Sequence, residues 1–326
     1  MKKRLLSIFL CLCMVFGLVP ATVWAETTNG HTHYLCGGST CNGSGHATES
    51  SKTTFATEIT QSGSTLKIGD ESWALTKVSN NEFYILPAGT YYLGSDISPN
   101  YTIRIEENVT LCLNGHKITG ANGMDAIKLT GGSFTLTDCQ NSGKITHASG
   151  NTGRGVYVDR GTFNMYGGSI TGNTAGTQGG GIYNAGKEDD SVYKPSDKKI
   201  TLYPTRGSRI TVTGNTVNGA ANNLATTQCI VLDRDYNTST TLLSTGSKIG
   251  VTVLEPANDK GVATINSKSN HYNTGAMVND IPRFTLDDDN DGQMELGANS
   301  GGATYIHLTI YHKHTLCNLD SASHDI

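Results

Sequence analysis

The chain has 326 residues, a formal net charge of −4, 36% hydrophobic residues and 39 glycines. A chain of this length can bury a sizeable core, so its eight cysteines are not those of a small disulfide-stapled scaffold. The mild acidity argues against nucleic acid and against an anionic membrane surface as partners.

Residues 1–25 have the pattern of a secretory signal peptide. Lys2, Lys3 and Arg4 precede an apolar stretch from Leu5 to Val19, and small residues occupy both cleavage-site positions. The apolar stretch, at about 15 residues, is shorter than the roughly 20 residues of a membrane-spanning helix. Removal of the signal leaves 21 basic and 28 acidic residues, a net charge of −7. We therefore predict an extracellular protein, secreted or associated with the cell surface, with no membrane span after signal removal.

Residues 26–63 are rich in His, Cys, Gly, Ser and Thr, which predicts a small His/Cys-rich module and a linker. Five candidate metal ligands lie close together in this module: His31, His33, Cys36, Cys41 and His46. Tetrahedral zinc takes four such nitrogen and sulfur ligands, so structural zinc is the favoured interpretation. A disulfide between Cys36 and Cys41 with exposed histidines is the alternative.

Residues 64–102 alternate apolar and polar positions around a Pro-Ala-Gly break, which predicts N-terminal cap strands. Residues 103–256 contain a repeated unit of short strands and glycine corners, in segments that begin at Ile103, Ala126, Gly155 and Lys199. A unit this short cannot bury an apolar face alone and must stack on its neighbours. The prediction is an all-β fold, a right-handed parallel β-helix or solenoid, behind the small N-terminal module.

Period-two alternation predicts which side chains of the repeat point inward. The equivalent apolar pairs of successive units are Phe134 and Leu136, Phe163 and Met165, and Ile200 and Leu202. Three asparagines are expected at corners, where their amides can form ladders between coils: Asn114, Asn173 and Asn215. The polar insert from Lys187 to Asp197 is expected on a surface loop.

Residues 257–310 are expected to form C-terminal strands with a hairpin, in which residues 284–286 pair with residues 294–296. Three carboxylates between these segments have the spacing of a calcium loop: Asp287, Asp289 and Asp291. Ala298 stands where the bidentate glutamate of such a loop belongs. An acidic hairpin turn is therefore favoured over a calcium site.

Residues 311–326 form a partial second His/Cys segment, with the candidate metal ligands His312, His314, Cys317 and His324. The spacing of residues 31–36 recurs here, but Ala322 takes the place of a second cysteine. A disulfide does not explain this recurrence, whereas three histidines and one cysteine still make the four ligands that zinc takes.

The remaining cysteines of the repeat region, Cys112, Cys139 and Cys229, lie in apolar segments and are expected as buried thiols that act as small hydrophobes. Cys112 and Cys139 are 27 residues apart, close to one coil, so they could pair across coils. An exposed aromatic strip suited to sugar stacking is a further hypothesis, with the candidates Tyr157, Tyr166, Tyr183, Tyr193 and Tyr203.

The phrases VTLCLNGHKITG, GTFNMYGGSITGNT, GGGIYN and KIGVTVLEP, together with the opening HTHYLCGGSTC, are the distinctive parts of the chain. With these phrases it resembles the adhesin-like, parallel β-helix exported proteins of anaerobic Gram-positive gut bacteria. The resemblance implies a surface or adhesive role without naming a ligand. The expected function is a non-catalytic module for surface display or adhesion, with glycans or host surface proteins as partners.

The alternative is a carbohydrate-active enzyme, a polysaccharide lyase or glycoside hydrolase, because parallel β-helices also carry those activities. Such chemistry needs carboxylates that converge on one groove. The candidates are Asp125, Asp138, Asp159, Glu188, Asp189, Asp190, Asp233 and Asp235. Most of them fall near corners or in the insert and are interpreted as solvated turn residues, so no catalytic residue is assigned.

Overall fold

The computed structural model describes residues 31–33, 35, 53–78, 81–184, 198–203, 209–233, 243–254, 256, 261–266, 279–288, 294–300 and 306–312. Within these ranges the protein is nearly all β, as predicted, and a 3-10 turn, η1 (Ile281–Arg283), follows two helical residues at 279–280. No helix in the same ranges is long and apolar enough to cross a bilayer. The predicted signal peptide and the insert at 187–197 lie outside the described residues.

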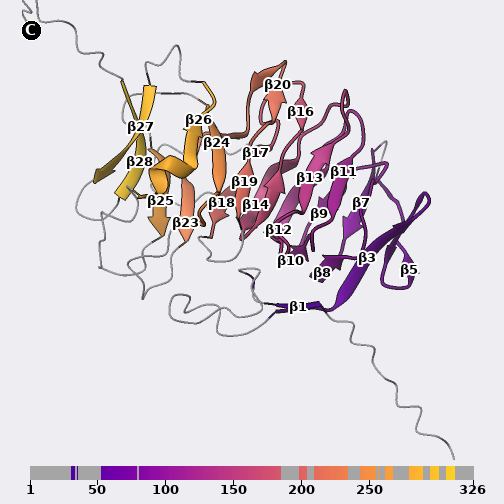
Figure 1. Ribbon diagram of the computed structural model, residues 1–326. Helices are drawn as coiled ribbons and strands as arrows, with labels where there is room; N and C mark the ends of the chain where they lie inside the picture. Colours follow the sequence, from indigo (N-terminus) through magenta and orange to yellow (C-terminus); the bar gives the residue numbers. More distant parts are fainter. Residues whose placement is uncertain are drawn as a thin grey trace, which may run out of the picture.

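Most strands belong to one large sheet, rich in parallel pairs, that extends along the molecule (Figure 1). The parallel pairs form three ladders, which are rows of strands that each come from successive repeats. In the first ladder each strand pairs in parallel with the equivalent strand of the next repeat. Its members are β3 (Thr57–Ser62), β8 (Gly89–Leu93), β10 (Val109–Cys112), β12 (Ile127–Thr137), β14 (Val156–Met165), β18 (Lys198–Leu202), β23 (Ile230–Asp233) and β25 (Gly261–Asn266). β3 lies within the predicted linker and is already a strand of this sheet.

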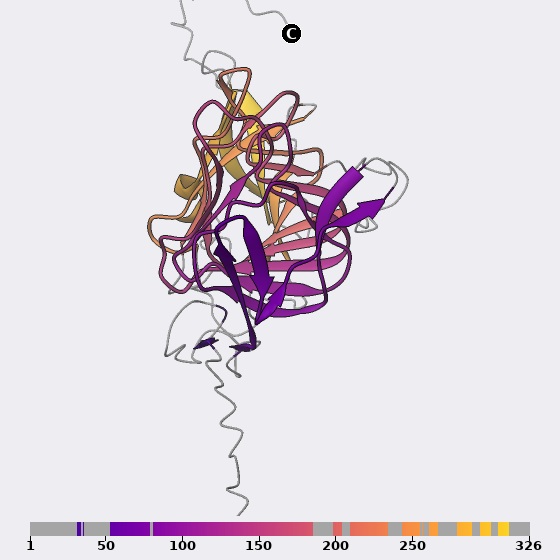
Figure 2. The same cartoon turned by 90° about the vertical axis from the view of Figure 1, so that its right-hand side faces the viewer.

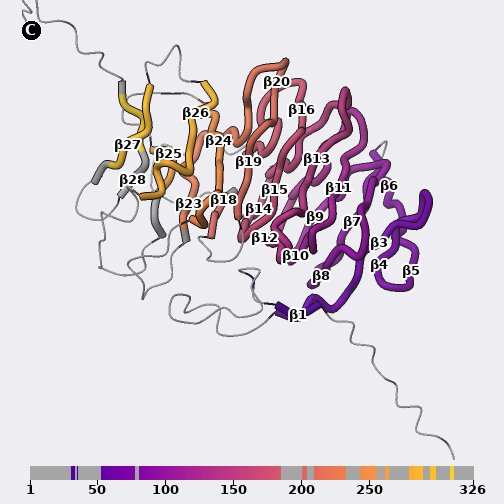
Figure 3. The backbone as a smooth tube through the Cα atoms, in the orientation of Figure 1, coloured from indigo at the N-terminus to yellow at the C-terminus, as the bar shows by residue number. Residues whose placement is uncertain are grey.

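Two further parallel ladders accompany the first. The second contains β7 (Asn81–Leu86), β9 (Ile103–Ile105), the first halves of β12 and β14, β17 (Ile182–Asn184), β22 (Leu224–Thr226), β24 (Lys248–Val253) and β26 (Phe284–Leu286). The third contains β11 (Lys117–Gly120), β13 (Lys144–His147), β15 (Gly168–Ile170), β19 (Ile210–Val212) and the start of β24. The backbone advances steadily from one repeat to the next (Figure 3), which is compatible with the predicted β-helix.

Antiparallel strands flank this parallel sheet. At the N-terminal end they are β4 (Thr65–Ile68), β5 (Glu71–Ser72) and β6 (Thr76–Val78). At the C-terminal end they are β27 (Met294–Ser300) and β28 (Ile306–His312). A small separate sheet contains β16 (Thr174–Ala175), β20 (Thr216–Val217) and β21 (Ala220–Ala221).

The apolar core lies between the ladders, which surround it in the view of Figure 2. Residues Phe134, Phe163 and Ile200 are in register on β12, β14 and β18, and all three are buried. The rings of Phe134 and Phe163 stack at a centroid distance of 5.4 Å. The predicted inward stacks are therefore confirmed, because alternation along each strand directs these side chains to the same face.

A buried polar ladder runs beside the apolar core. Asn173 Nδ2 donates to Asn215 Oδ1 at 2.8 Å, and Asn215 Nδ2 donates to Asn223 Oδ1 at 3.1 Å. Asn223 Nδ2 in turn donates to Asp287 Oδ1 at 2.6 Å, and His147 Nδ1 lies 2.7 Å from Asn173 Oδ1 at the other end. The predicted ladder therefore exists at Asn173 and Asn215, and it satisfies amides that would be costly to bury alone.

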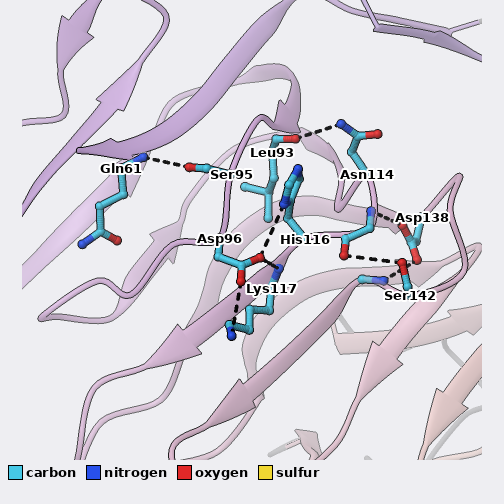
Figure 4. Close-up of polar contacts among 11 residues, drawn as sticks. Gln61, Leu93, Ser95, Asp96, Asn114, His116, Lys117, Asp138 and Ser142 are labelled. Atoms are coloured by element: carbon cyan, nitrogen blue, oxygen red, sulfur yellow. Dashed lines mark hydrogen bonds and ion pairs between the residues drawn. The ribbon is translucent and has the colours of Figure 1, made fainter. Parts of the chain in front are cut away.

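Asn114 belongs to a different corner, between β10 and β11. Asn114 and Gly115 both have positive φ, 50° and 80°, so two consecutive left-handed residues make the turn. The Asp138 carboxylate accepts hydrogen bonds from the amides of Gly115 at 2.8 Å and Gly143 at 2.7 Å. Figure 4 shows Asn114 and Asp138 side by side at this corner, where the buried carboxylate ties one turn to the next.

The predicted hairpin between residues 284–286 and 294–296 is wrong. β26 pairs in parallel with β24, whereas β27 forms its hairpin with β28. Asp287 ends the polar ladder, because its carboxylate accepts hydrogen bonds from Asn223 and from the Thr252 hydroxyl at 2.8 Å. These bonds engage both carboxylate oxygens of Asp287, while Asp289 and Asp291 lie outside the described residues.

Candidate metal centre

The histidine half of the candidate site lies on a short hairpin. β1 (His31–His33) pairs antiparallel with β2 (Thr53–Phe55), just before β3 enters the large sheet. Side chains two apart in a strand share a face, so His31 and His33 point the same way and Thr32 points the other way. In Figure 1 this hairpin lies at the edge of the sheet, next to β8.

The cysteine half comes from two successive repeats of the first ladder. In β10, Leu111 points into the apolar core, so the next residue, Cys112, faces the hairpin instead. Cys112 is in register with Tyr92 of β8 and Thr137 of β12. Cys139 follows two residues after Thr137, in the bend that ends β12, and so reaches the same outer surface.

The four side chains converge on one point. The ligand atoms of His31, His33, Cys112 and Cys139 all lie within 4.8 Å of one another. His31 Nε2 is 3.2 Å from Cys139 Sγ and 3.5 Å from Cys112 Sγ, and the two sulfur atoms are 3.8 Å apart. Two imidazoles and two thiols at these separations can hold a metal ion.

A small second apolar cluster packs around the centre, in which His33 and Cys112 are buried and His31 and Cys139 are partly buried. It consists of Phe55, Tyr92 and Cys112, with Leu35 and Cys139 packed against it. His33 stacks on Phe55 at 4.5 Å and His31 on Tyr92 at 5.2 Å, so both imidazole planes are held by aromatic neighbours. The Thr137 hydroxyl also donates to the Leu35 carbonyl at 2.6 Å, which anchors the chain just after β1.

Burial, followed by the neighbouring His33, lowers the pKa of His31. The neutral imidazole that this favours is the form that binds metals. A hydrogen bond donated by the Cys112 thiol raises the pKa of Cys112 and lowers that of Cys139. Cys139 is therefore the sulfur better suited to carry negative charge in the absence of an ion.

The structure keeps two of the five ligands predicted for the N-terminal module. His31 and His33 belong to the site, but their sulfur partners are Cys112 and Cys139, while Cys36, Cys41 and His46 lie outside the described residues. Strand alternation around Leu111 was a usable signal, because it directs Cys112 away from the core. The spacing of Cys112 and Cys139, close to one repeat, was the second signal.

The C-terminal set is not brought together within the described residues. His312 ends β28, where its backbone pairs with Met294, and His314, Cys317 and His324 lie beyond the described part of the chain. Cys229 is half-buried in another repeat, just before β23.

Three of the candidate catalytic carboxylates, Asp125, Asp138 and Asp159, have structural partners. Asp138 is 0% exposed, so its interpretation as a solvated turn residue is wrong: it bonds to backbone amides at the corner described above. Asp125 lies 3.4 Å from the Arg154 guanidinium, and Asp159 accepts a 3.5 Å hydrogen bond from Tyr157. Asp233 ends β23, and Glu188, Asp189, Asp190 and Asp235 lie outside the described residues.

The tyrosines form two stacked pairs. Tyr157 and Tyr183 are in register, with ring centroids 5.5 Å apart, and Tyr166 and Tyr203 stack at 3.9 Å; Tyr193 lies outside the described residues. Arg154 lies 4.9 Å from the centroids of both Tyr157 and Tyr183. Because the rings of each pair stack on each other, each pair has less free ring surface for a sugar than two separate tyrosines would have.

Comparison of the chain with family models, with curated proteins and with solved structures found no match.

Proposed function

We propose that this protein is an exported, non-catalytic scaffold for surface display or adhesion, whose N-terminal hairpin is fastened by a structural zinc ion. The scaffold in this proposal is a right-handed parallel β-helix. Three parallel ladders that each join successive repeats support that architecture. Its right-handedness follows from the strong preference of parallel crossover connections for that hand.

The convergence of four nitrogen and sulfur ligands is the observation that carries the zinc assignment. With Zn–S near 2.3 Å and Zn–N near 2.0–2.1 Å, a tetrahedral ion sets sulfur atoms about 3.8 Å apart and sulfur and nitrogen about 3.5 Å apart. Two observed separations match these values, 3.8 Å for Cys112 to Cys139 and 3.5 Å for Cys112 to His31, while His31 to Cys139 is shorter at 3.2 Å and the whole set lies within 4.8 Å. A Cys112–Cys139 disulfide would need the sulfur atoms at about 2.05 Å.

The ligand count supports a structural ion. Two cysteines and two histidines complete a tetrahedral shell, whereas catalytic zinc sites keep a position open for water or substrate. The ligands come from β1, β10 and the bend after β12, so one ion would join three segments that are distant in sequence. Its role would be to hold the hairpin on the outer face of the sheet.

The partners proposed for the scaffold are glycans or host surface proteins. The outward row of the second ladder supports a glycan, because Tyr157 and Tyr183 are in register on neighbouring repeats and both are partly exposed. Their exposed ring surfaces are the proposed contacts for a sugar. Sugars bind to such faces through their C–H groups.

Metal analysis of the mature chain tests the zinc centre. We expect about one zinc per chain, loss of that zinc in the Cys112→Ser/Cys139→Ser variant, and its retention in the Cys36→Ser/Cys41→Ser variant. The second variant separates the ligand set of the structure from the set predicted within the N-terminal module. Zinc retained in Cys112→Ser/Cys139→Ser and lost in Cys36→Ser/Cys41→Ser would overturn the assignment.

A glycan array run beside a polysaccharide depolymerisation assay tests the wider role. Binding without cleavage is expected, and Tyr183→Ala should weaken it while Tyr166→Ala, on the other ladder, should leave it unchanged. New reducing or unsaturated ends would contradict the non-catalytic proposal.

A further inference from the structure

The two sulfur atoms of the metal centre are close enough to react with each other. Cys112 Sγ and Cys139 Sγ are 3.8 Å apart, so a disulfide needs them roughly 1.8 Å closer. Cys112 is in register with Thr137, and Cys139 follows Thr137 by two residues, so the two cysteines belong to neighbouring repeats. Rotation of one side chain and a small backbone shift would therefore join them.

The two cysteines differ in mobility and in access. Cys112 is 0% exposed and lies within a strand that pairs on both sides, with β8 and with β12. Cys139 is half-buried and lies in the bend after β12, outside any strand. A thiol–disulfide exchange depends on the access of the attacking sulfur, so Cys139 would react with an external disulfide first.

We propose that Cys112 and Cys139 are a disulfide-forming pair, and that their oxidation by a small-molecule disulfide releases the metal and with it the N-terminal hairpin. The inference rests on the proposed zinc centre for its consequence, but the disulfide itself depends only on the two cysteines. The chemical class of the oxidant is a low-molecular-weight disulfide such as oxidised glutathione.

The reaction proceeds in two balanced exchanges. The Cys139 thiolate attacks one sulfur of the small disulfide, forms a mixed disulfide and expels one small thiolate. The Cys112 thiolate then attacks the Cys139 sulfur, forms the Cys112–Cys139 bond and expels the second small thiolate. Two electrons pass from the protein to the small disulfide, whose two thiolates take protons from water. Zinc leaves because both of its sulfur ligands have lost their negative charge.

Oxidation would replace the zinc-mediated link between β1 and the sheet with a disulfide between two repeats of the sheet. The reduced, metal-bound form ties β1 to the sheet through His31 and His33. The oxidised form would cross-link two neighbouring repeats while the hairpin kept only its packing around Phe55 and the hydrogen bond from Thr137 to Leu35. The strength with which the N-terminal hairpin is held on the sheet would then depend on the ratio of small thiols to small disulfides in the surroundings.

The test treats the purified mature chain with oxidised glutathione, measures free zinc with a chromogenic chelator and maps disulfides by peptide mass spectrometry. We expect one zinc released for each Cys112–Cys139 bond, and an accelerated protease cleavage between residues 31 and 55. Zinc release with a Cys36–Cys41 bond and reduced Cys112 and Cys139 would overturn the proposal. A protein that forms the Cys112–Cys139 bond but never contained zinc would refute only the proposed metal centre.

Two single variants test the order of attack. In Cys112→Ser a glutathione adduct should accumulate on Cys139, because the resolving thiol is absent. In Cys139→Ser the buried Cys112 should remain a free thiol over the same period. Equal adduct formation in both variants would contradict the assignment of Cys139 as the attacking sulfur, and a circular dichroism spectrum of each variant verifies that it is folded.

Discussion

The inner and outer faces of the same strands behave as two different regions of this protein. The inner face is an apolar stack in which Phe134, Phe163 and Ile200 repeat the same role in successive repeats. The outer face next to the hairpin carries a cluster around Cys112 and Cys139 that occurs once in the described part of the chain. Two adjacent residues of β10 belong to different regions: Leu111 packs in the apolar core, and Cys112 belongs to the outer cluster. A single strand therefore contributes both to the core of the sheet and to the contact between the sheet and the N-terminal hairpin.

The first prediction concerns the inner stack, where the largest effect is expected. Phe163→Ala removes a fully buried ring that stacks on Phe134, and such substitutions cost about 3–5 kcal/mol through lost burial and a remaining cavity. The free energy of unfolding from urea titration measures this loss. Thr162→Ala, the preceding residue on the opposite face of β14, is the control and should change stability by less than about 0.5 kcal/mol. A similar loss in both variants would remove the distinction between the two faces.

The second prediction concerns the outer cluster. A bound ion stabilises the folded state in proportion to the logarithm of its concentration over Kd, about 2.7 kcal/mol at a hundredfold excess. Addition of a zinc chelator should therefore lower the Tm of the wild-type chain by several degrees, and it should not lower the Tm of His33→Ala further. Thr32→Ala, on the opposite face of β1, should respond to the chelator like the wild type. Equal chelator responses in all three proteins would place the stabilising ion elsewhere.

The third prediction concerns the polar ladder, where a smaller effect is expected. Asn215→Ala removes the acceptor of Asn173 and the donor to the Ile170 carbonyl, both buried, at a cost of about 1–3 kcal/mol. Asn164→Ala on the outer face breaks a 2.8 Å bond to Ser133, but water can replace that bond. We expect its cost to be below that of Asn215→Ala in the same urea titration. The reverse order would mean that the ladder contributes less than its burial implies.

Much of the β architecture could be predicted from local patterns. The repeated segments and their alternation identified the strands of the first ladder and the inward positions from Phe134 to Leu202, because both depend on residues close together in the chain. The corner asparagines Asn173 and Asn215 followed from their equivalent places in the repeat. The hairpin at residues 284–296 was mispredicted, because a strand with suitable alternation does not reveal whether its partner is the next segment or the previous repeat.

The candidate site could be predicted only in part. The spacing of His31 and His33 identified two of the four residues that lie close enough to hold a metal ion, since residues two apart in a strand share a face. Their neighbours Cys36 and Cys41 were the obvious sulfur ligands by sequence distance. The structure instead brings Cys112 and Cys139 to the histidines, from segments that only the packing of the hairpin on the sheet could join.

The sequence by itself therefore determined the β character, the repeat, the inward apolar rows and the His-x-His half of the candidate metal centre. These depend on period-two alternation and on the inability of a short unit to bury its apolar face alone. Only the tertiary structure decided which cysteines face the histidines, because that depends on the register between repeats and on the surface where the hairpin docks. A contact between residues 31 and 139 has no local signature in the chain.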